Sequence, residues 1–133
     1  MAVAADRPAV LIVEDDTLVR FDAMQSFEDA GFEVVDAYAG DQALSILDQR
    51  PDIQAIFTDI QMPGDIDGLG LAHAARSRSP GLAVVITSGV VSLRAGDLPF
   101  GVVFLPKPYD STQVAALVLK LIQRGQPGLE TRA

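Results

Sequence analysis

Short apolar runs rich in β-branched residues alternate along this chain with amphipathic helical patterns. This alternation is typical of an α/β domain in which helices join parallel strands. A chain of 133 residues is long enough for one such domain with its own core. The expected strands are Ala9–Val13, Phe32–Ala37, Ile53–Thr58, Leu82–Thr87 and Gly101–Leu105. We therefore predict a doubly wound sheet of five parallel strands.

The expected helices are Thr17–Ala30, Asp41–Gln49, Leu69–Arg78 and a last one from Asp110 or Ser111 to Arg124. Thr17 is the expected N-cap of the first helix, and Gly31 suits the left-handed position that ends it. The stretch 90–100 contains Gly96 and Pro99, so a helix there is expected to be short or missing. Residues 1–7 and 125–133 are expected to be disordered, which leaves 8–124 as the domain.

The charge and the apolar pattern exclude several classes of protein. A net charge of −8 disfavours nucleic acid binding, and no apolar run is long enough to span a membrane or resembles a secretion signal. Without cysteines there are no disulfides or thiolate metal sites. We therefore expect a cytoplasmic protein. Residues 1–66 carry 14 acidic and 3 basic side chains, which indicates either unevenly solvated helix faces or a cation site.

Polar side chains stand where four of the expected strands end. Glu14 and Asp15 follow the first strand, Asp59 the third, Thr87 or Ser88 the fourth, and Lys107 the fifth. In doubly wound sheets, ligands bind at the carboxyl ends of the strands. The pattern therefore predicts one site that combines three carboxylates, a hydroxyl and an amine.

Clustered carboxylates repel one another unless cations offset their charge. Mg²⁺ prefers carboxylate oxygens, and Lys107, which is one of only two lysines and lies between Pro106 and Pro108, supplies a fixed positive charge. An alternative is that Lys107 only stabilises its loop through an ion pair. With both cations present, an aspartate can attack phosphorus and form an acyl phosphate, so the residues indicate a metal-assisted phosphoryl acceptor.

Four segments resemble the receiver domains of two-component response regulators, and the similarity extends over about residues 8–124. They are VLIVEDD at 10–16, TDIQMP at 58–63, ITSG at 86–89 and KPY at 107–109. The resemblance implies the flavodoxin-like receiver fold with strand order 2-1-3-4-5. It also implies a stand-alone phosphoacceptor switch, acting through protein contacts or a phosphorelay, rather than an enzyme.

By this resemblance, Asp59 accepts a phosphoryl group from a sensor histidine kinase, a histidine phosphotransfer protein or a small phosphodonor. Mg²⁺, or Mn²⁺ in its place, is implied to bind Asp15, Asp59 and the backbone carbonyl of Gln61, with Glu14 acting through water. The loop after Asp59 has one residue more than the usual pattern, which affects the rim of the site and not its ligands.

The resemblance also implies residues that respond to phosphorylation. Ser88, which is followed by the small Gly89, matches the switch hydroxyl, while Thr87 is expected to point into the core. Lys107 contacts the phosphoryl group, Phe104 matches the switch aromatic residue, and the Lys107–Pro108 peptide is expected to be cis.

Two alternative functions fit the residues less well. A Mg²⁺ phosphohydrolase would place a carboxylate two residues after its nucleophile, where this chain has Gln61. A flavodoxin-like cofactor binder would need a phosphate-binding loop after the first strand, where Glu14, Asp15 and Asp16 repel phosphate.

Leu18 and Phe21 fall outside the apolar stripe of the first helix, and we expect them to contact a kinase.

Overall fold

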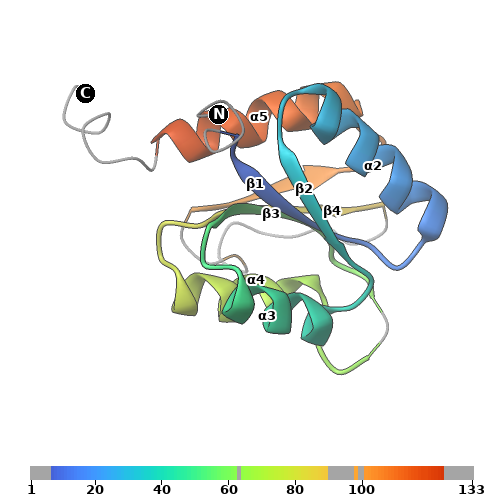
Figure 1. Cartoon of the computed structure of the whole chain (residues 1–133). Helices are drawn as coiled ribbons and strands as arrows, with labels where there is room; N and C mark the ends of the chain where they lie inside the picture. Colours follow the sequence, from blue (N-terminus) through green and yellow to red (C-terminus); the bar gives the residue numbers. More distant parts are fainter. Residues whose placement is uncertain (1–6, 63, 90–97, 99–100, 125–133) are drawn as a thin grey trace.

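A computed structural model describes residues 7–62, 64–89, 98 and 101–124. Its sheet has five parallel strands in the order β2-β1-β3-β4-β5, which confirms the predicted fold (Figure 1). The strands are β1 (Ala9–Val13), β2 (Glu33–Ala37), β3 (Ile53–Asp59), β4 (Ala83–Ser88) and β5 (Val102–Pro106). After β1 the chain adds β2 on one side of it, and then β3, β4 and β5 in turn on the other side. The strand order therefore reverses between β1 and β3.

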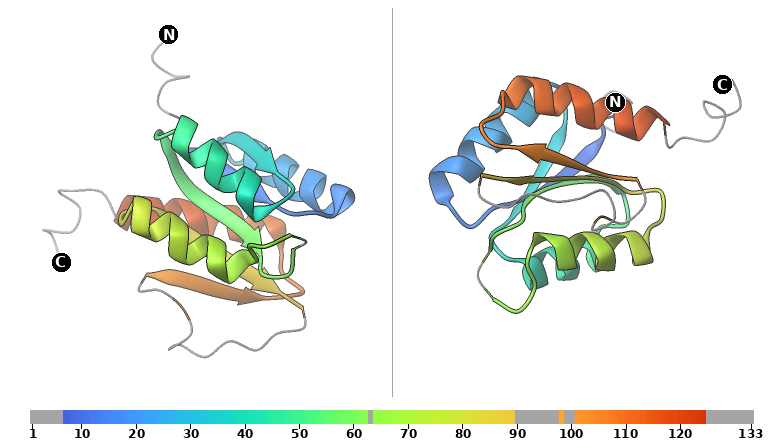
Figure 2. Two further views of the ribbon diagram at one scale, coloured as in Figure 1. Left: turned by 90° about the horizontal axis from the view of Figure 1, so that it is seen from below. Right: turned by 180° about the vertical axis from the view of Figure 1, so that it is seen from behind.

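Four helices lie within the described residues and cover both faces of the sheet. They are α2 (Thr17–Asp29), α3 (Gly40–Gln49), α4 (Gly68–Arg78) and α5 (Ser111–Arg124). Helices α2 and α5 lie on one face and α3 and α4 on the other, as the views from three sides agree (Figures 1 and 2). This three-layer arrangement buries the central strands on both sides.

Each face of the sheet has its own apolar core. On the α3 and α4 side the core includes Leu11, Ile56 and Ile86. On the α2 and α5 side it includes Phe27, and Phe32 meets the Phe27 ring edge-on with centroids 5.1 Å apart. Strands buried on both faces need continuous apolar runs, which explains why the sequence showed runs rather than strict alternation.

The start of α2 differs from the prediction. Asp16, and not Thr17, is the N-cap, because its carboxylate accepts hydrogen bonds from the backbone N–H groups of Leu18 and Val19. The helix ends at Asp29, one residue earlier than expected. Gly31 has φ +96°, as predicted for the residue that ends this helix.

At the start of α5, the Asp110 carboxylate accepts hydrogen bonds from the backbone N–H and the hydroxyl of Thr112. Asp110 is therefore the capping residue of the two that were considered. The predictions for residues 1–6, 90–97, 99–100 and 125–133, including the short or missing helix, lie outside the described residues. Among the described helices, none has the length and apolar character needed to cross a membrane.

Candidate functional site

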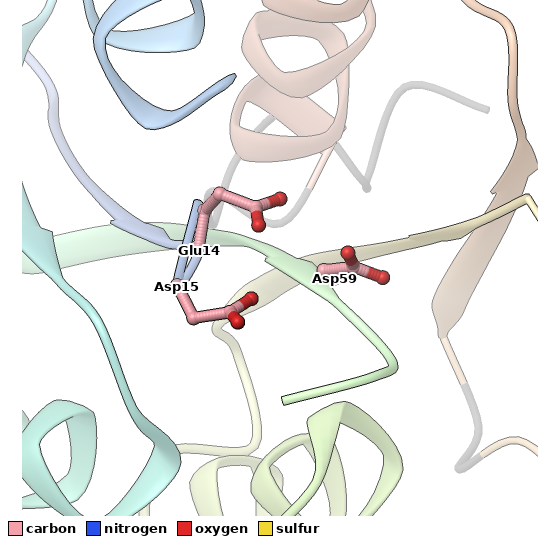
Figure 3. A group of neighbouring side chains, drawn as sticks. All are labelled: Glu14, Asp15 and Asp59. Carbon is pink, nitrogen blue, oxygen red and sulfur yellow. The ribbon is translucent and has the colours of Figure 1, made fainter. Parts of the chain in front are cut away.

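The predicted acidic residues meet at the carboxyl end of the two central strands. Glu14 and Asp15 follow β1 directly, and Asp59 is the last residue of the neighbouring β3. One carboxylate oxygen from each residue lies within 4.8 Å of the others (Figure 3). Glu14 and Asp59 are only 6% and 9% exposed, whereas Asp15 is exposed. The three side chains therefore form an acidic cluster with two buried members and one exposed member, which is called the acidic pocket below.

Lys107 brings a positive charge to this pocket. Its Nζ atom lies 3.2 Å from Asp59 Oδ2, and its backbone N–H donates a 3.0 Å hydrogen bond to the Ser88 carbonyl. The Lys107–Pro108 peptide is cis, as predicted. A Cβ atom at Gly89 would make an ordinary van der Waals contact with the Lys107 side chain at 3.6 Å, so the lysine stem lies beside this residue.

Both oxygens of Asp59 have a donor. The backbone N–H of Gln61 donates to Oδ1 over 3.2 Å, and Lys107 donates to Oδ2 over the same distance. The Gln61 side chain itself is exposed. The carboxylate is therefore held in a defined orientation with one face toward Glu14 and Asp15.

Two backbone contacts fix the residues after β1. The Asp16 N–H donates to Glu14 Oε2 over 3.0 Å, and Arg20 Nη1 donates to the Glu14 carbonyl over 2.8 Å. Arg20 Nε also lies 3.1 Å from Asp36 Oδ2, but it is not aligned for a hydrogen bond, so this contact is an ion pair. Arg20 was not among the predicted site residues. The sequence feature that could have marked Arg20 is a basic side chain beside the apolar stripe of a helix that is otherwise acidic.

Gly68, at the start of α4, was also missed. A Cβ atom there would overlap the Asp59 carbonyl oxygen and the Ile60 Cα atom. The Gly68 N–H donates a 2.8 Å hydrogen bond to the Ile60 carbonyl, which closes the loop after β3 against the strand end. Glycine is required at position 68 because the start of α4 passes so close to the backbone of Asp59.

The crowding of carboxylates changes proton affinities in the pocket. Burial, with smaller effects of Asp59 and Asp15, raises the pKa of Glu14 to about 7 against the opposing effects of the Asp16 N–H and Lys107. Burial also raises the pKa of Tyr109 to about 12, with Glu14, Asp22 and Asp59 adding to the effect. A divalent cation would offset the repulsion that disfavours a charged Glu14.

Comparison with known sequences identifies the family. The family model for the response regulator receiver domain matches residues 10–119. The chain belongs to this family. The receiver domain is also similar in structure to a response regulator receiver protein from Sinorhizobium medicae WSM419, with a TM-score of 0.86 and 27% identity over 92% of this chain and 99% of that one. The receiver domain of the hybrid histidine kinase CckA gives a TM-score of 0.74 and 34% identity over 86% and 99%.

The receiver domain matches only parts of its curated relatives. It is 31% identical to the sensor kinase CckA of Brucella abortus over 86% of this chain but 12% of that protein. It is also 31% identical to the DNA-binding transcriptional regulator NtrC of Salmonella typhimurium over 95% of this chain and 27% of that protein. The similarity therefore concerns the receiver domain and not the larger proteins.

The remaining predicted residues of the receiver domain lie on β4 and β5. Thr87 pairs with Asp59 across the sheet and is 1% exposed, which confirms its predicted burial, and Ser88 follows it with 2% exposed. Phe104 pairs with Ile86 and is partly buried against the core on the α3 and α4 side. Ser88 therefore ends the strand next to β3, and Phe104 lies on the strand beyond it.

Proposed function

We propose that this receiver domain is a phosphorylation switch in which Asp59 accepts a phosphoryl group from the phosphohistidine of a sensor kinase or a histidine phosphotransfer protein. The observation that carries the proposal is the position of Asp59, beside two further carboxylates and 3.2 Å from the Lys107 ammonium. An ammonium this close can stabilise the negative charge of the phosphoryl oxygens.

The donor set fits a hard divalent cation. Asp15 and Asp59 would hold Mg²⁺, or Mn²⁺, together with the backbone carbonyl of Gln61, and Glu14 would act through water. When bound, the ion supplies charge neutralisation at the transferring phosphoryl oxygens. The raised pKa of Glu14 supports this assignment, because a buried carboxylate with two acidic neighbours is stabilised by a cation.

In the transfer step, a carboxylate oxygen of Asp59 forms the new bond to phosphorus. The bond from phosphorus to the donor breaks, and its electron pair goes to the histidine nitrogen, or to the carboxylate of a small acyl phosphate. Lys107 pairs with the phosphoryl oxygens, and the Gln61 N–H keeps the attacking carboxylate oriented. With a proton on its other ring nitrogen, the histidine leaves as neutral imidazole, so this chain supplies no proton in the step.

The switch proposed for this domain uses two residues at the strand ends. Ser88 donates its hydroxyl to a phosphoryl oxygen, and Phe104 moves further into the protein when Ser88 does so. The support is their burial and position, since Ser88 ends β4 and Phe104 is partly buried on β5 next to it. Such a movement changes the surface near β5 that other proteins contact.

Net turnover by this site is proposed to be slow. The residue two positions after Asp59 is Gln61, which has no carboxylate to act as a general base toward water. Val90, two residues after Ser88 in the sequence, likewise has no charged group that could act on water. We infer a phosphorylated lifetime of minutes or longer, limited by autodephosphorylation, and therefore a switch and not a phosphohydrolase.

The proposed partners are proteins in the cytoplasm. Leu18 and Phe21 at the start of α2 are 80% and 54% exposed, and this helix adjoins the acidic pocket. Large apolar side chains in such a position suit the helices that carry a phosphohistidine. Phe21→Glu is expected to slow transfer from a phosphorylated histidine kinase while leaving phosphorylation by acetyl phosphate unchanged. Equal slowing with both donors would contradict a role in docking.

The central experiment measures the phosphoryl adduct directly. The protein is incubated with acetyl phosphate and Mg²⁺, and intact mass is recorded for the wild type and Asp59→Asn. An adduct on the wild type that is absent from the variant and from samples with a metal chelator supports the proposal. An adduct on both proteins, or on neither with acetyl phosphate or a phosphorylated kinase, contradicts it.

A further inference from the structure

The loop after β3 carries one of the proposed metal ligands, the backbone carbonyl of Gln61. A carbonyl ligand moves only with its backbone, so its position depends on how the loop is held. The Gln61 N–H donates to Asp59 Oδ1 over 3.2 Å, and the Gly68 N–H donates to the Ile60 carbonyl over 2.8 Å. Asp59 and Gly68 therefore hold the backbone directly before the Gln61 carbonyl.

A third contact holds this loop from α3, a helix that supplies none of the predicted site residues. Gly40 is the first residue of α3 and is buried. A Cβ atom there would lie 2.7 Å from the Ile66 carbonyl oxygen and 2.9 Å from the Ile66 Cβ and Cγ2 atoms. Ile66 also packs against the core on the α3 and α4 side. The end of the loop therefore rests directly on the start of α3.

The glycine at position 40 is explained by this contact and not by its backbone conformation. Its φ lies outside the left-handed region, so a residue with a side chain could adopt the same conformation. Glycine is also less favourable than alanine in a helix. The property that glycine supplies at this position is therefore space for Ile66.

A short path connects Ile66 to the residues that carry the proposed ligands. Gly68 follows Ile66 by two residues, and a Cβ atom on Gly68 would overlap the Asp59 carbonyl oxygen. Because these backbones are in close contact, a displacement of one is transmitted to the other. A methyl group added at Gly40 would therefore displace Ile66 and, through Gly68, the end of β3 and the residues that follow it.

We propose that Gly40 and Ile66 are positioning residues for the metal site, because their contact holds the loop that carries the Gln61 carbonyl. This inference rests on the proposed function, which makes that carbonyl and Asp59 metal ligands. Neither Gly40 nor Ile66 is a ligand itself. Their contact determines how well the ligands are placed before an ion binds, and it therefore sets the affinity for Mg²⁺.

The test measures Mg²⁺ affinity by isothermal titration calorimetry, together with thermal unfolding in the presence of a chelator. Gly40→Ala is expected to weaken Mg²⁺ binding roughly tenfold, the effect of losing a contact that supports a metal ligand. With acetyl phosphate, its initial phosphorylation rate should approach the wild-type value at saturating Mg²⁺. Gly70→Ala is the matched control, because its Cβ atom would meet Ile66 Cγ2 at an ordinary 3.5 Å, so its Kd should stay unchanged.

A second pair of variants changes the other side of the contact, and it decides the test if Gly40→Ala does not fold. Ile66→Ala removes the Cγ2 atom that lies against Gly40 and is expected to weaken Mg²⁺ binding severalfold. Ile66→Val keeps the branched Cβ and should bind Mg²⁺ like the wild type.

The inference is overturned if Gly40→Ala and Ile66→Ala melt lower than the wild type but bind Mg²⁺ with an unchanged Kd, because the contact would then serve stability alone. Equal changes of Kd in Gly40→Ala and Gly70→Ala, or in Ile66→Ala and Ile66→Val, would also overturn it. A wild type that binds no Mg²⁺ and forms no adduct contradicts the proposed function itself, so the two failures are distinguishable.

Discussion

Lys107 Nζ lies 3.2 Å from Asp59 Oδ2, although 48 residues separate them in the chain. The contact depends on the register of β4 with β5, in which Ser88 pairs with Pro106 and its carbonyl accepts the Lys107 N–H. The lysine stem is held beside Gly89, and its ammonium is directed at the floor of the acidic pocket. Lys107 is therefore placed to stabilise the carboxylates and, in the proposed switch, the phosphoryl group.

Replacement of Lys107 by methionine is expected to slow phosphorylation. The variant keeps much of the side-chain volume but removes the charge, so the initial rate with acetyl phosphate and Mg²⁺ should fall by roughly tenfold or more. Lys120→Met is the matched control, because Lys120 is the other lysine and lies exposed on α5. Similar rates for the two variants would contradict a direct role of the Lys107 ammonium.

The metal-free protein is expected to lose stability as pH rises through the Glu14 titration. The folded pKa of about 7 exceeds the ordinary value of 4.5, so the folded state binds more protons between these pH values. The stabilising contribution is fully present below pH 4.5 and is lost as pH rises through 7. We expect the free energy of unfolding to fall by on the order of 1–3 kcal/mol from this group.

Urea unfolding at pH 5.5 and pH 8 with a chelator measures this change. Glu14→Gln removes the titration, so the variant should lose less stability over the same interval, and Mg²⁺ should restore much of the loss in the wild type. If the variant and the wild type show the same dependence on pH, another group is responsible.

Most helices and strands were predicted to within a residue because each strand is a continuous apolar run and each helix has a periodic stripe. The cap of α2 was the exception. Asp15, Asp16 and Thr17 are consecutive residues that can all cap a helix. Only the backbone direction after β1 decides that the Asp16 carboxylate reaches the N–H groups of Leu18 and Val19.

The acidic pocket was predictable for the same reason as the sheet, since residues at the ends of adjacent parallel strands must meet. Arg20 and Gly68 were not predictable in this way. The contact of Arg20 with Asp36 depends on how α2 packs over β2, and that of Gly68 with Asp59 depends on how the loop after β3 returns. Packing between elements decides both contacts, and local sequence patterns carry no information on it.

Arg20→Met is expected to weaken binding of Mg²⁺. The guanidinium contacts the Glu14 carbonyl and the Asp36 carboxylate. Its loss removes the contact that holds the backbone after β1, and with it the proposed metal ligands Glu14 and Asp15 become less well positioned. Loss of such a supporting contact lowers metal affinity by roughly tenfold or more. Isothermal titration calorimetry with MgCl₂ measures the effect, and Arg124→Met at the exposed end of α5 is the control. An unchanged Kd with a lower melting temperature would assign Arg20 to stability alone.

Gly68→Ala is expected to displace the backbone of Asp59, the proposed phosphoacceptor. The added methyl group meets the Asp59 carbonyl and the Ile60 Cα atom, both of them backbone, so the strand end or the start of α4 must shift. We expect a loss of about 1–3 kcal/mol in the free energy of unfolding, measured in urea, and slower phosphorylation by acetyl phosphate.

Gly70→Ala is the matched control on the same helix. Its Cβ atom would meet only the side chains of Asp67 and Ile66, at 3.4 and 3.5 Å, and alanine favours the helix by up to about 1 kcal/mol over glycine. Gly70→Ala should therefore be neutral or stabilising, with phosphorylation unchanged. Equal effects of the two substitutions would mean that helix propensity, and not the close approach to Asp59, explains the glycine at position 68.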